Sequence, residues 1–301
     1  MVGAQKTLKK YRGRLMLSVD LVHSTIYRYH WPVLLGPHRL MLRPREARDT
    51  RLVSFEVTMN PDAELVWTHD VAGNAIATAN FKDKTDYLKI ESRSKIEMAA
   101  SQWPVFTISA AACTFPFTYS DDEWIDLGAL TAQHYPDPTG RLSDWVNGFI
   151  FSSPTDTLSL LKDISFGISQ RTTYRRRESE GTQTPLETLD NQEGSCRDFA
   201  VLFVAAARCL GFGARIVSGY LVNTDSSLRG SDGSGSTHAW AEVFLPGAGW
   251  VAFDPTNRSV GSGNLISVAV VREMTQAVPV AGEFTGGRGA LIDMSVAVSI
   301  T

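Results

Sequence analysis

The sequence predicts an α+β protein: an N-terminal antiparallel β-sandwich-like domain, followed by a core that combines a central helix with antiparallel strands. Apolar and polar residues alternate with a period of two through most of the first hundred residues, as in strands with one buried face. Later in the chain, one strongly amphipathic helical segment at 196–210 precedes several apolar, strand-like segments. A helix packed on a sheet lets both elements bury their apolar faces.

The N-terminal domain is expected over residues 1–105 as a set of short strands. Alternation begins after Arg14 and ends near Met98, and no helical periodicity interrupts it. The sequence Ala72-Gly73-Asn74 is typical of a turn and predicts a hairpin. The strands are expected at 15–22, 52–57, 65–70, 75–81 and 87–98. Several short strands separated by turns favour a sandwich or a barrel.

Residues 106–140 are predicted to form a packed connector between two domains. Proline and large aromatic residues are frequent in this region. Proline prevents long regular elements, and so many aromatic rings are not typical of a free linker. The second domain is therefore expected at 141–301, and a chain of 301 residues is long enough for both.

The second domain is expected to contain two helices and five strands. In the helix at 196–210, apolar residues lie three, four, seven and eleven positions after Phe199. Ser195 is the expected N-cap residue, and Asp198 follows three residues later in an acidic variant of the capping box. The other helix is expected at 155–166, and the strands at 214–222, 238–245, 250–253, 266–271 and 291–300.

The composition is that of a soluble globular protein, with 43% hydrophobic and 20% charged residues. The formal net charge of −3 gives no reason to expect nucleic acid or an anionic membrane as a partner. The densest basic stretch, 171–177, is followed directly by Glu178 and Glu180. We therefore expect it to be a solvated strand or turn.

Nothing in the sequence predicts export or membrane insertion. No apolar run reaches the roughly 18–20 residues of a transmembrane helix. The basic start of the chain lacks the apolar segment of a signal peptide. Cys113, Cys196 and Cys209 do not form a disulfide framework, which fits a reducing compartment. We expect a cytoplasmic protein with no membrane partner.

Three residues of the second half could supply a nucleophile, a base and an orienting acid. Cys196 opens the amphipathic helix, where unpaired N–H groups and the positive end of the helix dipole stabilise a thiolate. His238 opens a predicted strand, and Asp254 ends the next one, just before a proline. A hairpin turn at 246–249 would bring His238 and Asp254 together.

These residues also have less specific interpretations. A free cysteine is usually a small buried side chain, and we interpret Cys113 and Cys209 in this way because their surroundings are apolar. The neighbours of Cys196 are small or polar instead. Asp254 could be an ordinary turn residue, since Asp-Pro begins many turns. Cys, His and Asp can also bind zinc, but a structural zinc site usually needs four ligands and a close cysteine pair. We expect no metal and no cofactor.

Four segments of the second half resemble the bacterial transglutaminase-like superfamily, whose members include proteins described as cysteine proteases with a papain-like catalytic domain. They are Gly-Ser-Cys-Arg-Asp-Phe-Ala at 194–200, Ser-Gly-Tyr-Leu at 218–221, Thr-His-Ala-Trp-Ala-Glu-Val at 237–243 and Gly-Trp-Val-Ala-Phe-Asp-Pro-Thr-Asn at 249–257. The first half is similar to the β-rich domain that precedes this core, through 23–27, 39–45 and Gly73-Asn74. Ser195 is a departure, because a small apolar residue is more usual there.

The resemblance implies a Cys196, His238 and Asp254 triad that transfers an acyl group from a peptide or protein amide through a thioester. His238 would activate the thiol and protonate the leaving nitrogen, while Asp254 would orient the imidazole. The backbone N–H of Cys196 and one further donor would bind the oxyanion. Gln192 and Tyr174 are the candidates for that donor.

Three further features have two interpretations each. Trp240 either shields the histidine from water or is a core aromatic residue. The polar tract 223–237 is either a mobile rim of the site or a surface loop without catalytic effect. The N-terminal domain either presents substrate or contacts another protein, or it is a stabilising cover for the catalytic layer.

The acceptor of the acyl group stays open, because the same triad serves water and amines. Hydrolysis, by a peptidase or amidase, is the first expectation, since water is the default acceptor and no acidic groove for an amine is evident. Transfer to an amine, as in a transglutaminase, is the alternative. A binding or assembly module that keeps the fold with little activity is the third possibility. The sequence does not indicate an oligomeric state.

Overall fold

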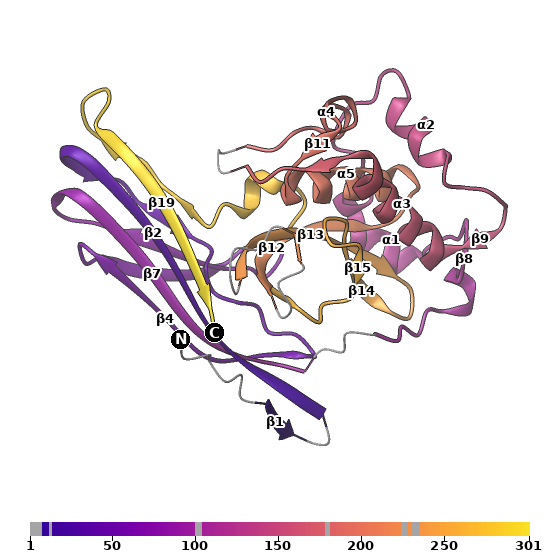
Figure 1. Ribbon diagram of the computed structural model, residues 1–301, viewed down its shortest axis with the longest axis horizontal. Helices are drawn as coiled ribbons and strands as arrows, with labels where there is room; N and C mark the ends of the chain where they lie inside the picture. The colour runs from indigo at the N-terminus through magenta and orange to yellow at the C-terminus, as the bar shows by residue number, and fades with distance from the viewer. Residues whose placement is uncertain (1–7, 12–13, 100–103, 178–180, 224–227, 230–234) are drawn as a thin grey trace.

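A long, curved antiparallel sheet dominates the N-terminal part of the protein (Figure 1). The structure is a computed structural model that describes residues 8–11, 14–99, 104–177, 181–223, 228–229 and 235–301. Within these residues, the central strands of the sheet are β2 (Arg14–Leu35) and β7 (Lys84–Met98), and β4 (Thr50–Asn60) pairs with β7. The other side of β2 pairs with three strands in turn: β1 (Leu8–Tyr11), β19 (Leu291–Ile300) and β18 (Phe284–Thr285).

A second, smaller sheet packs against this one. Its order is β17 (Val280–Ala281), β3 (His38–Leu40), β6 (Ala75–Asn80) and β5 (Glu64–His69). Leu40, Ala77 and Ala79 of the small sheet meet Leu88 and Ile90 of the large one in a buried cluster. The hairpin predicted at Ala72-Gly73-Asn74 joins β5 to β6.

The strands of the large sheet are longer than predicted. β2 alone has 22 residues, whereas a strand was expected only at 15–22. β2 continues through Pro32, although proline is rarely found in a central strand. The pairing with β7 shifts between Arg28 and Val33, so the missing N–H of Pro32 falls where the ladder is already irregular.

The C-terminal strands correct the predicted domain boundaries. Residues 141–301 were expected to form the second domain, but β19 pairs with β2 of the N-terminal sheet from Tyr29 to Leu21. β17 and β18 likewise join the N-terminal sheets. The strand itself was predicted correctly at 291–300. The strand with which it pairs could not be predicted, because local alternation identifies a strand but not the sheet to which it belongs.

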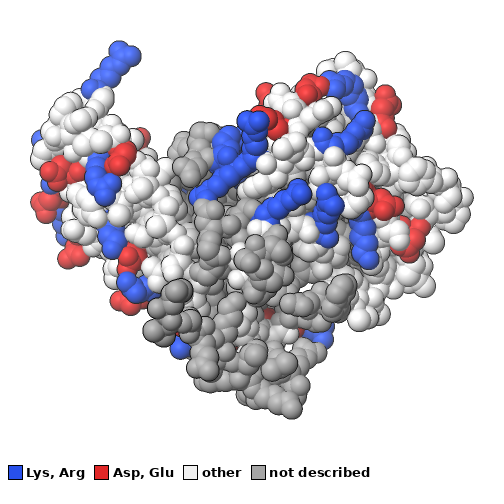
Figure 2. Space-filling view, viewed as in Figure 1, with Lys and Arg blue, Asp and Glu red and all other residues white. Residues whose placement is uncertain are grey.

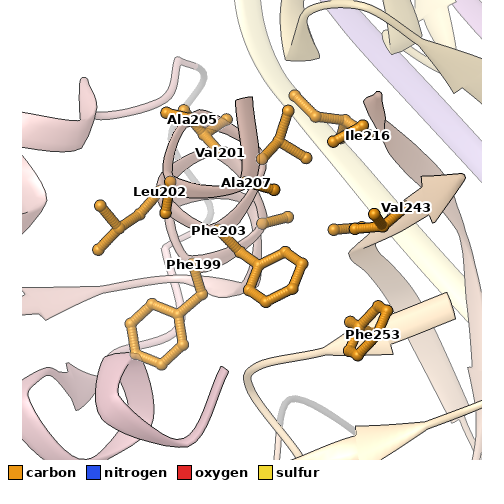
Figure 3. Packing of buried hydrophobic residues seen from close by; sticks show 14 of the residues in the cluster. Phe199, Val201, Leu202, Phe203, Ala205, Ala207, Ile216, Val243 and Phe253 are labelled. Atoms are coloured by element: carbon orange, nitrogen blue, oxygen red, sulfur yellow. The ribbon is translucent and has the colours of Figure 1, made fainter. Parts of the chain in front are cut away.

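The core consists of a five-stranded antiparallel sheet and the helix α5 (Cys196–Cys209). The sheet order is β15 (Ser259–Val260), β14 (Gly249–Asp254), β13 (Gly235–Leu245), β12 (Ala214–Val222) and β16 (Leu265–Val271). Phe203 of α5 stacks on Phe253 of β14 with ring centroids 5.2 Å apart, and Figure 3 shows it pointing toward Phe253 and Val243. The predicted α+β class, with a central helix on antiparallel strands, is confirmed.

The remaining helices lie on the side of the core away from the large sheet (Figure 1). They are α1 (Asp121–Leu127), α2 (Arg141–Asn147), α3 (Thr157–Arg171) and α4 (Pro185–Asn191). α3 starts two residues later and ends five later than predicted, because its last turns still bury Ile168 and Ser169. α1, α2 and α4 were not predicted, since helices of two turns are too short to show a periodic pattern. Of the helices in the described residues, none has the length and apolar character that a bilayer crossing demands.

Short elements complete the core. They are the two-residue strands β8 (Thr114–Phe115), β9 (Thr155–Asp156), β10 (Thr173–Tyr174) and β11 (Glu193–Gly194), and the 3₁₀ turns Ala110–Ala112, Gly128–Leu130 and Met274–Ala277. The longest element between residues 106 and 140 is the seven-residue α1, in keeping with the expected effect of the prolines there.

Asn74 ties the N-terminal region to the free edge of the core sheet. Its fully buried amide accepts a hydrogen bond from the Val270 N–H (2.9 Å) and donates one to the Val270 carbonyl (2.8 Å). The Arg45 side chain donates to the Asn74 oxygen (2.7 Å), and the Arg45 N–H donates to the Ser267 carbonyl of the same edge strand (2.8 Å). These contacts provide hydrogen-bond partners for backbone groups at the edge strand β16. The N-terminal region therefore helps to stabilise the core sheet.

Candidate active site

Cys196 is the first residue of α5, and its side chain is half-buried. Ser195 is the N-cap residue and has an extended backbone, as predicted. Its hydroxyl donates to the Asp198 carboxylate (2.8 Å), and so does its backbone N–H (2.7 Å). The thiol therefore belongs to the first turn of a fourteen-residue helix, where free N–H groups and the helix dipole favour an anion.

Asp198 anchors the chain around this first turn. It is fully buried and accepts hydrogen bonds from the Gln183 N–H (2.7 Å) and the Arg177 guanidinium (2.8 Å), besides those from Ser195. Arg177 thus pairs with a buried carboxylate, so the expectation of a merely solvated basic stretch at 171–177 is wrong for this residue. Charge-assisted bonds of this kind hold the segment before α4 against the start of α5.

His238 and Asp254 lie together in the interior. The β13–β14 hairpin pairs Ala241 with Phe253 and Leu245 with Gly249, close to the expected register. His238 Nε2 lies 2.8 Å from Asp254 Oδ2, and both side chains are completely buried. An ionised carboxylate only accepts hydrogen bonds, so Nε2–H is the donor.

Asn257 holds the Asp254 carboxylate in place and was not singled out from the sequence. Its side-chain amide donates to Asp254 Oδ2 (2.8 Å), while the N–H groups of Thr256 and Asn257 donate to Oδ1 (3.0 and 3.3 Å). The Asn257 oxygen in turn accepts the Arg229 N–H (2.8 Å). The only available signal was the short polar sequence after Asp254, which is typical of a turn that folds back on its aspartate.

The three groups shift one another's pKa values. Burial opposes the charged form of each, yet their mutual attraction outweighs it. Burial raises the pKa of the Cys196 thiol, but the His238 imidazole and the Ala239 N–H lower it below its ordinary value. Burial lowers the pKa of His238, but Asp254 and Cys196 raise it to about 10. The pKa of Asp254 is lowered, because His238 and Asn257 outweigh its burial. The arrangement therefore favours a thiolate beside an imidazolium.

The second nitrogen of His238, Nδ1, is the one that Asp254 does not contact. Among the described residues, Nδ1 has no nitrogen or oxygen partner, although the imidazole interacts with the Cys196 side chain. Because Asp254 occupies Nε2, Nδ1 is the atom that can exchange a proton with the thiol. The structure thus brings together the three residues that the sequence singled out.

Of the two oxyanion candidates, Tyr174 lies nearer to Cys196. β10 pairs with β11 in parallel, which places Tyr174 opposite Gly194, two residues before Cys196. Burial raises the pKa of Tyr174 to about 12, and the charge of Cys196 acts in the same direction, so the hydroxyl keeps its proton. Gln192 instead ends α4 in a left-handed conformation with its side chain exposed.

Trp240 is a buried aromatic residue next to His238. It is buried in a cluster with Val217 and Ala252, as a core aromatic residue is. Its ring also stacks on the His238 imidazole, with centroids 6.3 Å apart and planes at 25°. It therefore covers one face of the imidazole while it fills the core.

Other expectations have mixed outcomes. Cys113 is exposed and Cys209 is half-buried, so neither is the deeply buried side chain that was expected. No group of three or more potential metal ligands occurs within the described part of the chain. Most of the tract 223–237 lies outside the described residues, and Gly235, Ser236 and Thr237 belong to β13.

Comparison with known proteins identifies related sequences and folds. Residues 146–255 match the family model of the transglutaminase-like superfamily, and residues 19–97 match the bacterial transglutaminase-like N-terminal region. An uncharacterized protein of Mycobacterium tuberculosis is 28% identical over 296 residues, which cover 92% of this chain and 91% of the relative. An uncharacterized protein of Mycobacterium leprae is 38% identical over 116 residues, or 38% of this chain and 40% of the relative.

A solved structure shares the fold over nearly the whole length. The crystal structure of a protein from Cytophaga hutchinsonii, described as a “putative cysteine protease”, superimposes with a TM-score of 0.67 and 18% identity. The match covers 95% of this chain and 93% of that chain, so it includes both the N-terminal sheets and the core. By the family matches, residues 146–255 form a transglutaminase-like core and residues 19–97 a bacterial transglutaminase-like N-terminal region.

Proposed function

We propose that the protein is an enzyme that cleaves amide or peptide bonds by acyl transfer to Cys196. The observation that carries the proposal is the buried His238–Asp254 pair, 2.8 Å apart, beside a thiol of lowered pKa at a helix start. A buried ion pair costs free energy of folding, because two charges lose their hydration. Such a pair is therefore typical of a site where a charge is used, and here the imidazolium charge would stabilise a thiolate.

The proposed reaction has two halves. The thiolate attacks the amide carbonyl, and the resulting oxyanion accepts hydrogen bonds from the Cys196 N–H and from Tyr174. The C–N bond then breaks, the His238 imidazolium gives its proton to the departing nitrogen, and a thioester remains. In the second half His238 takes a proton from the acceptor, which attacks the thioester and releases the thiolate.

We place water first as the acceptor. The cavity beside the site is lined by Ser169, Gln170, Thr172, Thr173, Tyr174 and Arg229. None of these side chains is acidic, so nothing in that wall would attract a protonated amine. Transfer to an amine is the alternative outcome of the same chemistry.

The test is incubation with a library of peptide amides, with and without hydroxylamine, followed by mass analysis. We expect free acids without hydroxylamine and hydroxamates with it, because a thioester reacts with either nucleophile. The Cys196→Ala protein is the control and should give neither product. If wild-type protein also gives neither, the interpretation as a binding or assembly module is favoured.

A second prediction concerns the pH dependence of thiol alkylation. An ordinary cysteine has a pKa of about 8.5, so its thiolate is protonated as the pH falls from 9 to 7. Because the pKa of Cys196 is lowered, its thiolate should persist across that range. At pH 7 we expect iodoacetamide to modify Cys196 at least about tenfold faster in the folded protein than in the unfolded chain. Mass analysis of each cysteine peptide measures both rates, and a slower folded rate at every pH would contradict the prediction.

A further inference from the structure

A polar cavity of about 480 Å³ opens next to the proposed active site, a volume typical of small-ligand sites. One wall comes from the end of α3 and from β10: Ser169, Gln170, Thr172, Thr173 and Tyr174. Arg229 forms the other wall. The lining has hydroxyl and amide groups and one guanidinium, but no carboxylate.

Two contacts place this cavity beside the reacting groups. Tyr174 lies opposite Gly194 in the β10–β11 pair and interacts electrostatically with Cys196. On the other wall, the Arg229 N–H donates to Asn257, which donates in turn to Asp254. A substrate whose carbonyl is attacked at Cys196 could thus extend a neighbouring group past Tyr174 toward Arg229.

The surroundings of the cavity are positively charged. Within the described part of the chain, the Arg229 guanidinium has no carboxylate partner. Arg258 lies behind the lining, where it donates to the Ser169 hydroxyl (2.7 Å) and rests on the Phe166 ring. The positive charges of Arg176 and Arg197 both act to lower the pKa of the Tyr174 hydroxyl, which places them near the cavity.

Among the described residues, the acidic side chains near the cavity are themselves paired, and one of them, Glu193 opposite Thr173, pairs with Arg175. Asp254 is bound by His238, and Asp198 is fully buried against Arg177. In Figure 2, basic side chains are frequent over the part of the molecule where Figure 1 places α4 and α5, with acidic side chains among them.

We propose that this cavity is a subsite for a carboxylate of the acyl substrate, and that Arg229 binds it. The enzyme would then select peptides with an acidic residue next to the amide that it cleaves. The guanidinium supplies paired N–H donors that match a carboxylate, and the hydroxyl groups of the opposite wall can complete its hydrogen bonds. This inference rests on the proposed function, because it places the carboxylate relative to a substrate bound at Cys196.

Affinity labels that differ by one charge test the inference. The reagents are iodoacetyl-Glu-Ala-amide and iodoacetyl-Ala-Glu-amide, each compared with its glutamine counterpart. At one of the two positions, we expect the inactivation constant KI to be about tenfold lower for the acid, as for a charge-assisted hydrogen bond in a partly exposed site. Arg229→Ala should remove most of this preference, and Arg229→Lys should keep part of it. Salt should weaken it.

Arg51→Ala is the matched control. It removes one positive charge from an exposed side chain of β4 and should leave the ratio of the two constants unchanged. Equal constants for acid and amide at both positions, or a preference that survives Arg229→Ala, would overturn the inference.

Binding of acetyl-capped versions of the same peptides to the Cys196→Ala protein, measured by calorimetry, does not depend on thiol reactivity. A tighter binding of the acid there, lost in the Arg229→Ala double variant, supports the subsite even if no turnover is found. Fast alkylation of Cys196 without a difference between acid and amide supports the proposed function and rejects the subsite.

Discussion

Replacing Cys196 with alanine should abolish amide cleavage, with a fall in kcat of about 10⁶-fold, the order expected for the nucleophile of a catalytic triad. In the proposed reaction the sulfur forms the covalent bond to the acyl group, so its removal takes away the nucleophile beside the His238–Asp254 pair. His238→Ala should cost a similar factor, because the thiol then lacks its proton acceptor and the leaving nitrogen lacks its acid.

The double variant sharpens this prediction. If Cys196 and His238 act as one unit, the protein with both replacements should be no slower than either single variant. Cys113→Ala is the control, since Cys113 is an exposed cysteine of the connector and lies outside the site. Rates come from mass analysis of peptide-amide products, with thermal unfolding to verify that each variant is folded. Cleavage by Cys196→Ala within tenfold of wild type would mean that another group carries the reaction.

The sequence made the central part of the site predictable because short-range rules govern it. The helix that starts at Cys196 was evident from its periodicity and from the Ser195–Asp198 cap. The strands of His238 and Asp254 are joined by a short hairpin, so alternation and a turn were enough to bring the two residues together. Each of these inferences spans fewer than about twenty residues, the range over which local patterns are informative.

The parts that could not be predicted depend on contacts between distant segments. Asp198 and Arg177 are 21 positions apart, and nothing in the basic stretch distinguishes the arginine that enters the interior from those that stay outside. β19 has a clear strand pattern, yet its partner β2 lies more than 260 residues earlier. Asn74 reaches Val270 across 196 positions. Such pairings follow from the tertiary fold, where burial and edge satisfaction decide which polar groups meet.

Asp254→Asn should reduce kcat by about 10⁴-fold, less than the loss of Cys196 but far more than a surface change. The substitution keeps the shape of the side chain and removes its charge. That charge is the main influence that raises the pKa of His238 to about 10 against the effect of burial. Without it, only Cys196 opposes the effect of burial, and we expect the pKa of His238 to fall. The imidazole then gives up its proton at lower pH, and the thiol loses the neighbouring positive charge that lowers its own pKa.

The sign of the pH effect follows from these shifts. In wild-type protein the thiolate persists as the pH falls from 9 to 7, whereas in Asp254→Asn alkylation of Cys196 should decline over that range and recover at alkaline pH. Asp190→Asn is the matched control, because Asp190 forms an exposed ion pair with Arg141 and such pairs contribute little. If Asp254 only supported the fold, its replacement would lower the unfolding temperature and leave the pH profile of Cys196 unchanged. A shifted profile in a variant that stays folded would show that the carboxylate acts on the thiol through the imidazole.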